Sequence, residues 1–434
     1  MDGERQITFA PQGHILTNVN VWSFDSRWIV YDVRPDLEGA VFEGDRIERV
    51  NVESGEVEVL YRSDRGANCG VATYNPKRGE VVFIHGPEDP TDDWQYGASH
   101  RRGVIVKDSA PKKATNLDAR DLTPPFTPGA LRGGSHVHVF SEDGEWVSFT
   151  YNDALLNRFE EETDDHDVDL RNVGVSVPGE VTVSRDHPRN HDGGYFTVLV
   201  TRTTARPRPG SDEISKAYED AWVGTKGYVK PDGTRQKRAL AFQGLVRGKD
   251  GESFSEVYIV DLPDDLTLPG DGPLAGTERK RPSPPRGVSQ RRLTYTEARK
   301  YPGIQGPRHW LRSAPDGSRI AFLMKDDRGV VQIWTVSPNG GELEQLTRND
   351  LDIASAFTFS PGGKWIAHAM GGAVCLTNLA TGDTRPLTKS FPKAEAPRPE
   401  ACVFSPDGSM IAYVRTVASK EGKAFNQVFV VDVP

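Results

Sequence analysis

Two histidines with a single residue between them, His136 and His138, are the first residues of this sequence whose types and spacing indicate chemistry. They lie in the segment RGGSHVHVFSEDG (132–144), where alternating valines and histidines precede a Ser-Glu-Asp-Gly turn, and this pattern predicts a β-strand. Because alternate residues of a strand point to the same face, both imidazoles should lie on one side of the sheet. Two converging imidazoles can bind a divalent transition metal.

Arginines and further histidines gather in four segments. The loops TPGALRGGSH (127–136) and YPGIQGPRH (301–309) each run from Pro-Gly to an arginine and then a histidine, and YGASHRRGVIV (96–106) and RDHPRNH (185–191) add more. Since guanidinium groups bind carboxylates in a bidentate manner, these segments predict an anion pocket. The alternative, arginines scattered over the surface, stays open. The residues concerned are His100, Arg101, Arg102, Arg132, Arg185, His187, Arg189, His191 and Arg308.

An internal repeat indicates which elements position these residues. The segments FTFSPGGKWIAHAM (357–370) and CVFSPDGSMIAYVR (402–415) align without a gap, and LRSAPDGSRIAFLMK (311–325) aligns in the same register. Each contains a strand, a turn of Ser, Pro, Asp or Gly, and a second strand. Another hairpin, such as QIWTVSPNGGELEQLT (332–347), lies between the copies. The repeat is therefore about 45 residues long with four strands, which is typical of β-propeller blades.

The repeats predict an all-β fold, a single seven-bladed β-propeller of four-stranded blades over residues 1–434. The N-terminal strand RQITFA (5–10) should close the ring by joining the last blade beside the terminal strand. The fourth blade is expected to start at 191–204 and to carry an insertion over 205–290. Within it, GSDEISKAYEDAWVG (210–224) is predicted to form a short helix, because polar and acidic residues occupy its start.

The blade alignment predicts which side chains face the central channel. The residue four positions before the Phe of the F-S-P-D-G motif should border the channel, and His136 and His309 hold this position in different blades. With His138 and Glu400 they would form a site for a divalent metal, manganese above all, or iron or zinc. The alternative is a water-filled channel whose histidines bond to their neighbours. The aligned positions are Asn18, Gly70, His136, one near Arg185, His309, Ser355 and Glu400.

Composition argues against several classes of protein. The net charge of −9 disfavours non-specific nucleic-acid binding, which requires a basic face. The start MDGERQITFAPQGH lacks the features of a secretory signal, and no apolar run could span a membrane, so we expect a cytoplasmic protein. Its three cysteines form no C-x-x-C pair, and there is no P-loop and no G-x-S-x-G motif. The oligomeric state stays undetermined.

Over nearly its whole length the chain resembles the uncharacterised YidR-like bacterial propeller family. The resemblance rests on segments such as RQITFAPQGHILTN (5–18), ERVNVESGEVEVLY (48–61), TPGALRGGSHVHVFSEDGEWVSFTYND (127–153) and QRRLT (290–294). This family implies a propeller but no established activity. The F-S-P-D-G repeats are also similar to those of TolB, a propeller used for protein contacts.

The histidines and arginines are similar in kind to the site of oligogalacturonate lyases, which are propellers that bind manganese through histidines. This resemblance implies a metal-assisted enzyme that cleaves small acidic saccharides by β-elimination. It assigns metal binding to His136, His138, His309 and Glu400, the catalytic base to His100 or His187, and substrate binding to Arg102, Arg132 and Arg308. The alternative is a non-catalytic, TolB-like scaffold that binds a protein or a ligand.

Overall fold

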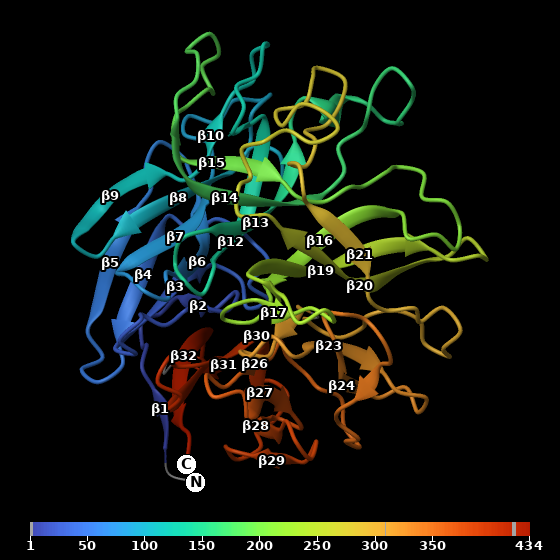
Figure 1. Cartoon of the computed structure of the whole chain (residues 1–434). Coiled ribbons are helices and arrows are strands. Elements are labelled where there is room, and N and C mark those ends of the chain that lie inside the picture. Colours follow the sequence, from blue (N-terminus) through green and yellow to red (C-terminus); the bar gives the residue numbers. More distant parts are fainter. Residues whose placement is uncertain (1–2, 309, 419–421) are drawn as a thin grey trace.

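Seven four-stranded sheets form a closed ring in the computed structural model of the chain (Figure 1), which describes residues 3–308, 310–418 and 422–434. The predicted all-β, seven-bladed propeller is confirmed. The strands of each blade are given from the inner to the outer one. They are, in blade 1, β2 (Gly13–Ile15), β3 (Trp28–Arg34), β4 (Arg46–Asn51) and β5 (Val57–Arg62); in blade 2, β6 (Cys69–Tyr74), β7 (Glu80–His85), β8 (Arg102–Lys107) and β9 (Ala110–Asn116); in blade 3, β12 (Gly133–Phe140), β13 (Val147–Asp153), β14 (Asn172–Val181) and β15 (Gly193–Leu199); and in blade 4, β16 (Ile214–Trp222), β19 (Arg238–Arg247), β20 (Ser253–Leu262) and β21 (Ser289–Arg292). They are, in blade 5, β22 (Arg312–Ser313), β23 (Ile320–Lys325), β24 (Val331–Val336) and β25 (Glu344–Gln345); in blade 6, β26 (Thr358–Phe359), β27 (Trp365–Met370), β28 (Ala373–Asn378) and β29 (Thr384–Pro386); and in blade 7, β30 (Pro397–Phe404), β31 (Met410–Ala418), β32 (Ala424–Asp432) and β1 (Glu4–Gln6).

The first strand closes the ring, as predicted. β1 pairs antiparallel with β32, so that Arg5 lies opposite Val430. The indole of Trp22 in blade 1 also donates a hydrogen bond of 3.0 Å to the carbonyl of Val403 in blade 7. The N-terminal strand thus becomes the outer strand of the last blade and closes the ring.

Apolar residues lie between each pair of neighbouring blades. Between blades 3 and 4, for example, Val175 and Val198 pack with Leu240 and Phe242 in one buried cluster. A further cluster joins residues of four inner strands or the turns before them, and we call it the central plug. It consists of Val71, Val137, Trp310 and Ala356 from blades 2, 3, 5 and 6, together with Ile84 from β7 of blade 2.

The fourth blade begins later than predicted. Residues 191–204 contain β15, the outer strand of blade 3, and the segment predicted as a helix forms β16, the inner strand of blade 4. The helix prediction was wrong because β16 has two register shifts, which place its buried residues Ile214, Ala217 and Asp220 three apart, close to a helical period. The segment 205–290 therefore holds the main strands of blade 4.

Two short ribbons decorate the ring. β10 (Ala119–Arg120) pairs with β11 (Ala130–Leu131), and β17 (Tyr228–Val229) pairs with β18 (Arg235–Gln236). The helical content of the described residues is one 3₁₀ turn, Leu156–Arg158. Among the residues that the structure describes, no helix is long and apolar enough to cross a membrane.

Candidate functional site

A cavity of about 750 Å³ lies between blades 2 and 3, and we call it the interblade pocket. One wall is the loop between β7 and β8, and the opposite wall is the loop between β14 and β15. Reciprocal backbone hydrogen bonds between Arg120 and His191, of 2.9 and 3.1 Å, join the second loop to β10. The lining residues are Arg65, Pro87, Glu88, Asp89, Thr91, Asp93, Trp94, Arg102, Asn116, Arg120, His187, Pro188, Arg189, Asn190 and His191.

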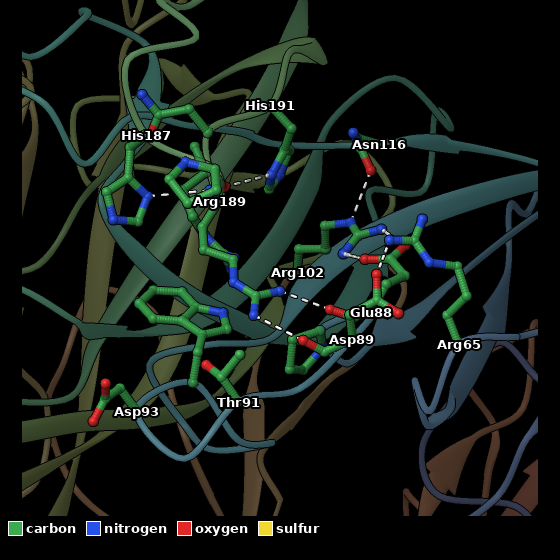
Figure 2. Close-up of a pocket in the computed structure, with 15 residues that line it drawn as sticks. Arg65, Glu88, Asp89, Thr91, Asp93, Arg102, Asn116, His187, Arg189 and His191 are labelled. Carbon is green, nitrogen blue, oxygen red and sulfur yellow. Dashed lines mark hydrogen bonds and ion pairs between the residues drawn. The ribbon is translucent and has the colours of Figure 1, made fainter.

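Four arginines line this pocket, and they divide into two kinds. Arg102 donates two hydrogen bonds to the carboxylate of Glu88, at 2.6 and 3.0 Å, and Arg65 pairs with Asp89 (Figure 2). Arg189 instead donates to the backbone carbonyls of Glu88 and Asp89, at 2.6 and 2.9 Å. Carboxylates therefore balance the charges of Arg102 and Arg65, whereas Arg189 bonds to neutral partners.

Arg120 is buried and has a carboxylate near it. Its guanidinium donates to the carbonyls of Gly133, His100 and Arg101. Burial lowers the pKa of Arg120 to about 10, although the charge of the buried Asp118 carboxylate raises it, so Arg120 stays a cation at neutral pH. Neither Arg120 nor Arg189 forms an ion pair within the described parts of the chain. Arg189 is thus the pocket guanidinium whose charge an acidic ligand could neutralise.

An indole lies beside these two cations. The guanidinium carbons of Arg120 and Arg189 lie 5.5 and 5.9 Å from the ring centre of Trp94. His100 stacks on Trp94 with ring centres 3.9 Å apart, and His187 lies 6.4 Å from it at a tilt. The sequence analysis did not predict Trp94 or Arg120 as site residues. A tryptophan in a loop between two predicted strands is a pattern that could have indicated Trp94.

Hydrogen bonds distinguish the two predicted catalytic histidines. Nδ1 of His100 lies 2.9 Å from the carbonyl of Gln95, so it must donate and the lone pair belongs to Nε2. Nδ1 of His187 accepts a 3.1 Å bond from the amide of Arg189, so its proton belongs to Nε2. Burial and nearby arginines lower the pKa of both side chains, which are therefore neutral near pH 7. His100 lies against Trp94, outside the lining residues.

The predicted substrate arginines do not converge. Arg102 lines the interblade pocket, but Arg308 lies 3.8 Å from Glu400 in another part of the ring. Arg132 is 1% exposed, forms an ion pair of 2.7 Å with Asp153 and donates to two backbone carbonyls of the loop 276–287. The geometry does not support its assignment to substrate binding, because all three guanidinium nitrogens bond to the protein.

The structure also corrects the predicted direction of His138. Val137 adopts a left-handed backbone conformation with φ of 57°, and the register of β12 shifts between His136 and Val139. Such a bulge reverses the alternation of side chains. Nε2 of His138 therefore lies 3.0 Å from the hydroxyl of Ser135, and the ring is fully buried against blade 2.

The predicted metal site is not assembled by the residues that the structure describes. His136 bonds through Nδ1 to Thr150, and His138 faces away from it. Glu400 forms a 2.8 Å ion pair with Arg398, while His309 lies outside the described residues. Across the described ranges, no three His, Cys, Asp or Glu side chains lie close enough to hold a metal ion. His136, His138 and Glu400 therefore do not form a manganese site among themselves.

His138 provides a test of this correction through the pH dependence of stability. Burial lowers its pKa to about 3, and burial also lowers those of His85 and His368 to about 4. Below pH 6.5 the unfolded chain binds protons that the folded protein does not. The free energy of unfolding should therefore decrease by about 1.4 kcal/mol for each histidine and each unit by which the pH is lowered. We expect His138→Leu to fold and to reduce this slope between pH 6.5 and 4.5, as measured by thermal melting. An unchanged slope, or a loss of bound metal, would contradict the buried position.

Fold and pocket together define a class, the seven-bladed propellers with a cavity between two blades. The chain belongs to the YidR family: it is 50% identical over 415 residues, 94% of each chain, to the uncharacterized protein YidR of Escherichia coli (strain K12). Residues 68–191 match a family described as a protein of unknown function (DUF3748), and this segment includes all the pocket residues except Arg65.

Solved structures share the fold at low identity. An oligogalacturonate lyase in complex with manganese is similar with a TM-score of 0.57 and 11% identity, over 99% of this chain and 93% of that chain. TolB from Acinetobacter baumannii is similar with a TM-score of 0.36 and 14% identity, over 94% of this chain and 80% of that chain. At these identities the likeness concerns the propeller fold.

Proposed function

We propose that the interblade pocket binds a small acidic saccharide and that the protein cleaves it by β-elimination. The observation that supports this most is Arg189, a cation without a carboxylate partner whose guanidinium lies beside the indole of Trp94. A guanidinium group suits the carboxylate of an acidic sugar, and an aromatic face suits its ring. The choice of saccharide and reaction follows the oligogalacturonate lyase that shares the fold.

β-Elimination requires a base, a neutralised carboxylate and a proton for the leaving oxygen. The base removes the C5 proton next to the carboxylate, a C4–C5 double bond forms, the C4–O bond breaks and the departing oxygen gains a proton. Cationic groups lower the barrier by neutralising the charge that grows on the carboxylate. Arg189 would have this role.

The two histidines would have different roles. His100, stacked on Trp94 of the pocket lining, carries its lone pair on Nε2 and would be the base that takes the C5 proton. Nε2–H of His187 would donate a hydrogen bond to the leaving oxygen, which takes its proton from water. Their lowered pKa values keep both neutral at pH 7, as a base and a neutral donor require. Manganese has no part in this proposal, because the described histidines and carboxylates do not gather around one point.

Incubation with trigalacturonate tests the proposal, since elimination yields an unsaturated uronate that absorbs in the ultraviolet. We expect turnover by the wild-type protein and a loss of about 10²- to 10⁴-fold in His100→Gln, the range for removing a general base. The dissociation constant for trigalacturonate, measured by calorimetry, should stay within a few-fold. Binding without any product would support a non-catalytic protein that binds a ligand, and no binding to the wild-type protein would contradict the proposed lyase function.

A further inference from the structure

A second cavity, of about 320 Å³, is lined by residues of all seven blades, and we call it the axial cavity. Its lining residues lie in the inner strands and in the turns that follow them, so the cavity lies on the axis of the ring. It shares no residue with the interblade pocket. The axial cavity is therefore separate from the proposed lyase site.

Apolar residues form more than half of this lining. The polar groups of its two indoles are satisfied within the protein, because Nε1 of Trp22 donates to the carbonyl of Val403 and Nε1 of Trp222 donates to that of Val139, both at 3.0 Å. A cavity of this size, with apolar walls and a few polar groups, is typical of a small-molecule site. The turns of the repeat contribute four prolines, Pro76, Pro315, Pro361 and Pro406.

Arg312 brings a buried cation to the axial cavity. Its guanidinium donates to Oδ1 of Asn18 at 3.0 Å and to the carbonyl of Leu311 at 2.7 Å. Because Asn18 belongs to blade 1 and Arg312 to blade 5, this side chain reaches across the channel. Arg312 is 7% exposed, and its Nε has no hydrogen-bond partner among the described residues. Burial lowers its pKa to about 10, while the charges of Glu219 and Asp220 raise it, so Arg312 is a cation at neutral pH.

Asp220 brings a buried carboxylate to the same cavity. It is 3% exposed, and neither of its oxygens accepts a hydrogen bond from the residues that the structure describes. The nearby hydroxyl of Ser148 donates instead to the carbonyl of Val139 at 3.5 Å. Burial raises the pKa of Asp220 to about 6, against the effects of Ser148 and Arg312, so most of it is ionised at pH 7. A buried carboxylate without donors is unfavourable unless a ligand supplies them.

The charges of the lining balance, with two of each sign on Lys77, Glu142, Asp220 and Arg312. Lys77 offsets Glu142, since its charge lowers the pKa that burial of Glu142 raises. Asp220 and Arg312 lie close enough to act on each other's pKa, yet no hydrogen bond joins them. A ligand that carries a positive and a negative group close together could therefore bond to both.

We propose that the axial cavity binds a free α-amino acid with an apolar side chain. The ammonium group donates to the carboxylate of Asp220, and the amino-acid carboxylate accepts from Nε of Arg312. The apolar side chain packs against the aromatic wall. A cation alone would leave Nε of Arg312 without a partner, and an anion alone would leave Asp220 without one. The ligand is a free amino acid because its two charges share one α-carbon, whereas those of a peptide are on different residues.

Calorimetric titration of the wild-type protein with L-phenylalanine tests the proposal, with phenethylamine and 3-phenylpropionate as analogues that each lack one of the two charges. We expect L-phenylalanine to bind and each analogue to bind at least about tenfold more weakly, because each loses one charge-assisted hydrogen bond. This comparison needs no variant. No binding of L-phenylalanine, or equal affinity for either analogue, overturns the proposal.

Asp220→Asn assigns the ammonium site. The variant should bind L-phenylalanine about 10- to 100-fold more weakly, while its affinity for 3-phenylpropionate, which has no ammonium, should change by less than about threefold. Without ligand it should melt no lower than the wild type, because an unpaired buried charge is removed, and L-phenylalanine should raise the melting temperature of the wild type more than that of the variant. Unchanged affinity for L-phenylalanine in Asp220→Asn overturns the proposal. So does equal weakening by Arg189→Gln, the control in the interblade pocket.

Discussion

Arg189→Gln should bind trigalacturonate about 10- to 100-fold more weakly than the wild-type protein. Arg189 is a pocket cation that bonds to backbone carbonyls and to no carboxylate, and its guanidinium lies 5.9 Å from the ring centre of Trp94. A hydrogen bond to a charged group contributes about 1.5–3 kcal/mol, which corresponds to that loss of affinity. Isothermal titration calorimetry measures the dissociation constants directly.

Arg65→Gln is the matched control for this prediction. Arg65 lines the same pocket, but its charge is paired with Asp89 and both side chains are well exposed. Exposed pairs contribute little, so the affinity should change by less than about threefold. Arg189→Lys should keep part of the binding, because it keeps the charge without the planar fork. Equal effects of Arg65→Gln and Arg189→Gln would contradict the role of Arg189.

Arg132→Met should reduce the free energy of unfolding by about 3–5 kcal/mol, the range for breaking a buried ion pair by removing one partner. The variant leaves the carboxylate of Asp153, which is 2% exposed, without its guanidinium at 2.7 Å. It also removes the donors for the carbonyls of Thr277 and Lys280. The loop 276–287 would then depend on the ion pairs of Lys280 and Arg281 with Asp167.

Melting temperatures, with limited proteolysis of the loop 276–287, measure this effect. Arg202→Gln breaks the exposed pair with Asp271 and should change stability by less than about 1 kcal/mol. Arg132→Met combined with Asp153→Asn should recover part of the loss, because no unpaired charge is then buried. A melting temperature of Arg132→Met equal to that of the wild type would show that Arg132 is free to bind a ligand after all.

The ring itself followed from local patterns. The turn residues of the F-S-P-D-G repeats set strand boundaries within each hairpin, and blade 7 required only that β1 pair with β32, an alignment that the apolar pattern of both strands already indicated. The error in blade 4 had a local cause as well. Two register shifts in β16 gave a strand the spacing of a helix, and a pattern of buried residues by itself does not distinguish the two.

The site depended on contacts that no local pattern contains. The sequence determined that histidines and arginines are plentiful between residues 96 and 191 and that they belong to neighbouring blades. Only the tertiary structure decided that a one-residue bulge at Val137 turns His138 away from His136. It also decided that Glu88 neutralises Arg102 while Arg189 meets only carbonyls. The physical reason is that strand pairing and turns are set by neighbouring residues, whereas the direction and charge balance of a side chain depend on partners far away in the sequence.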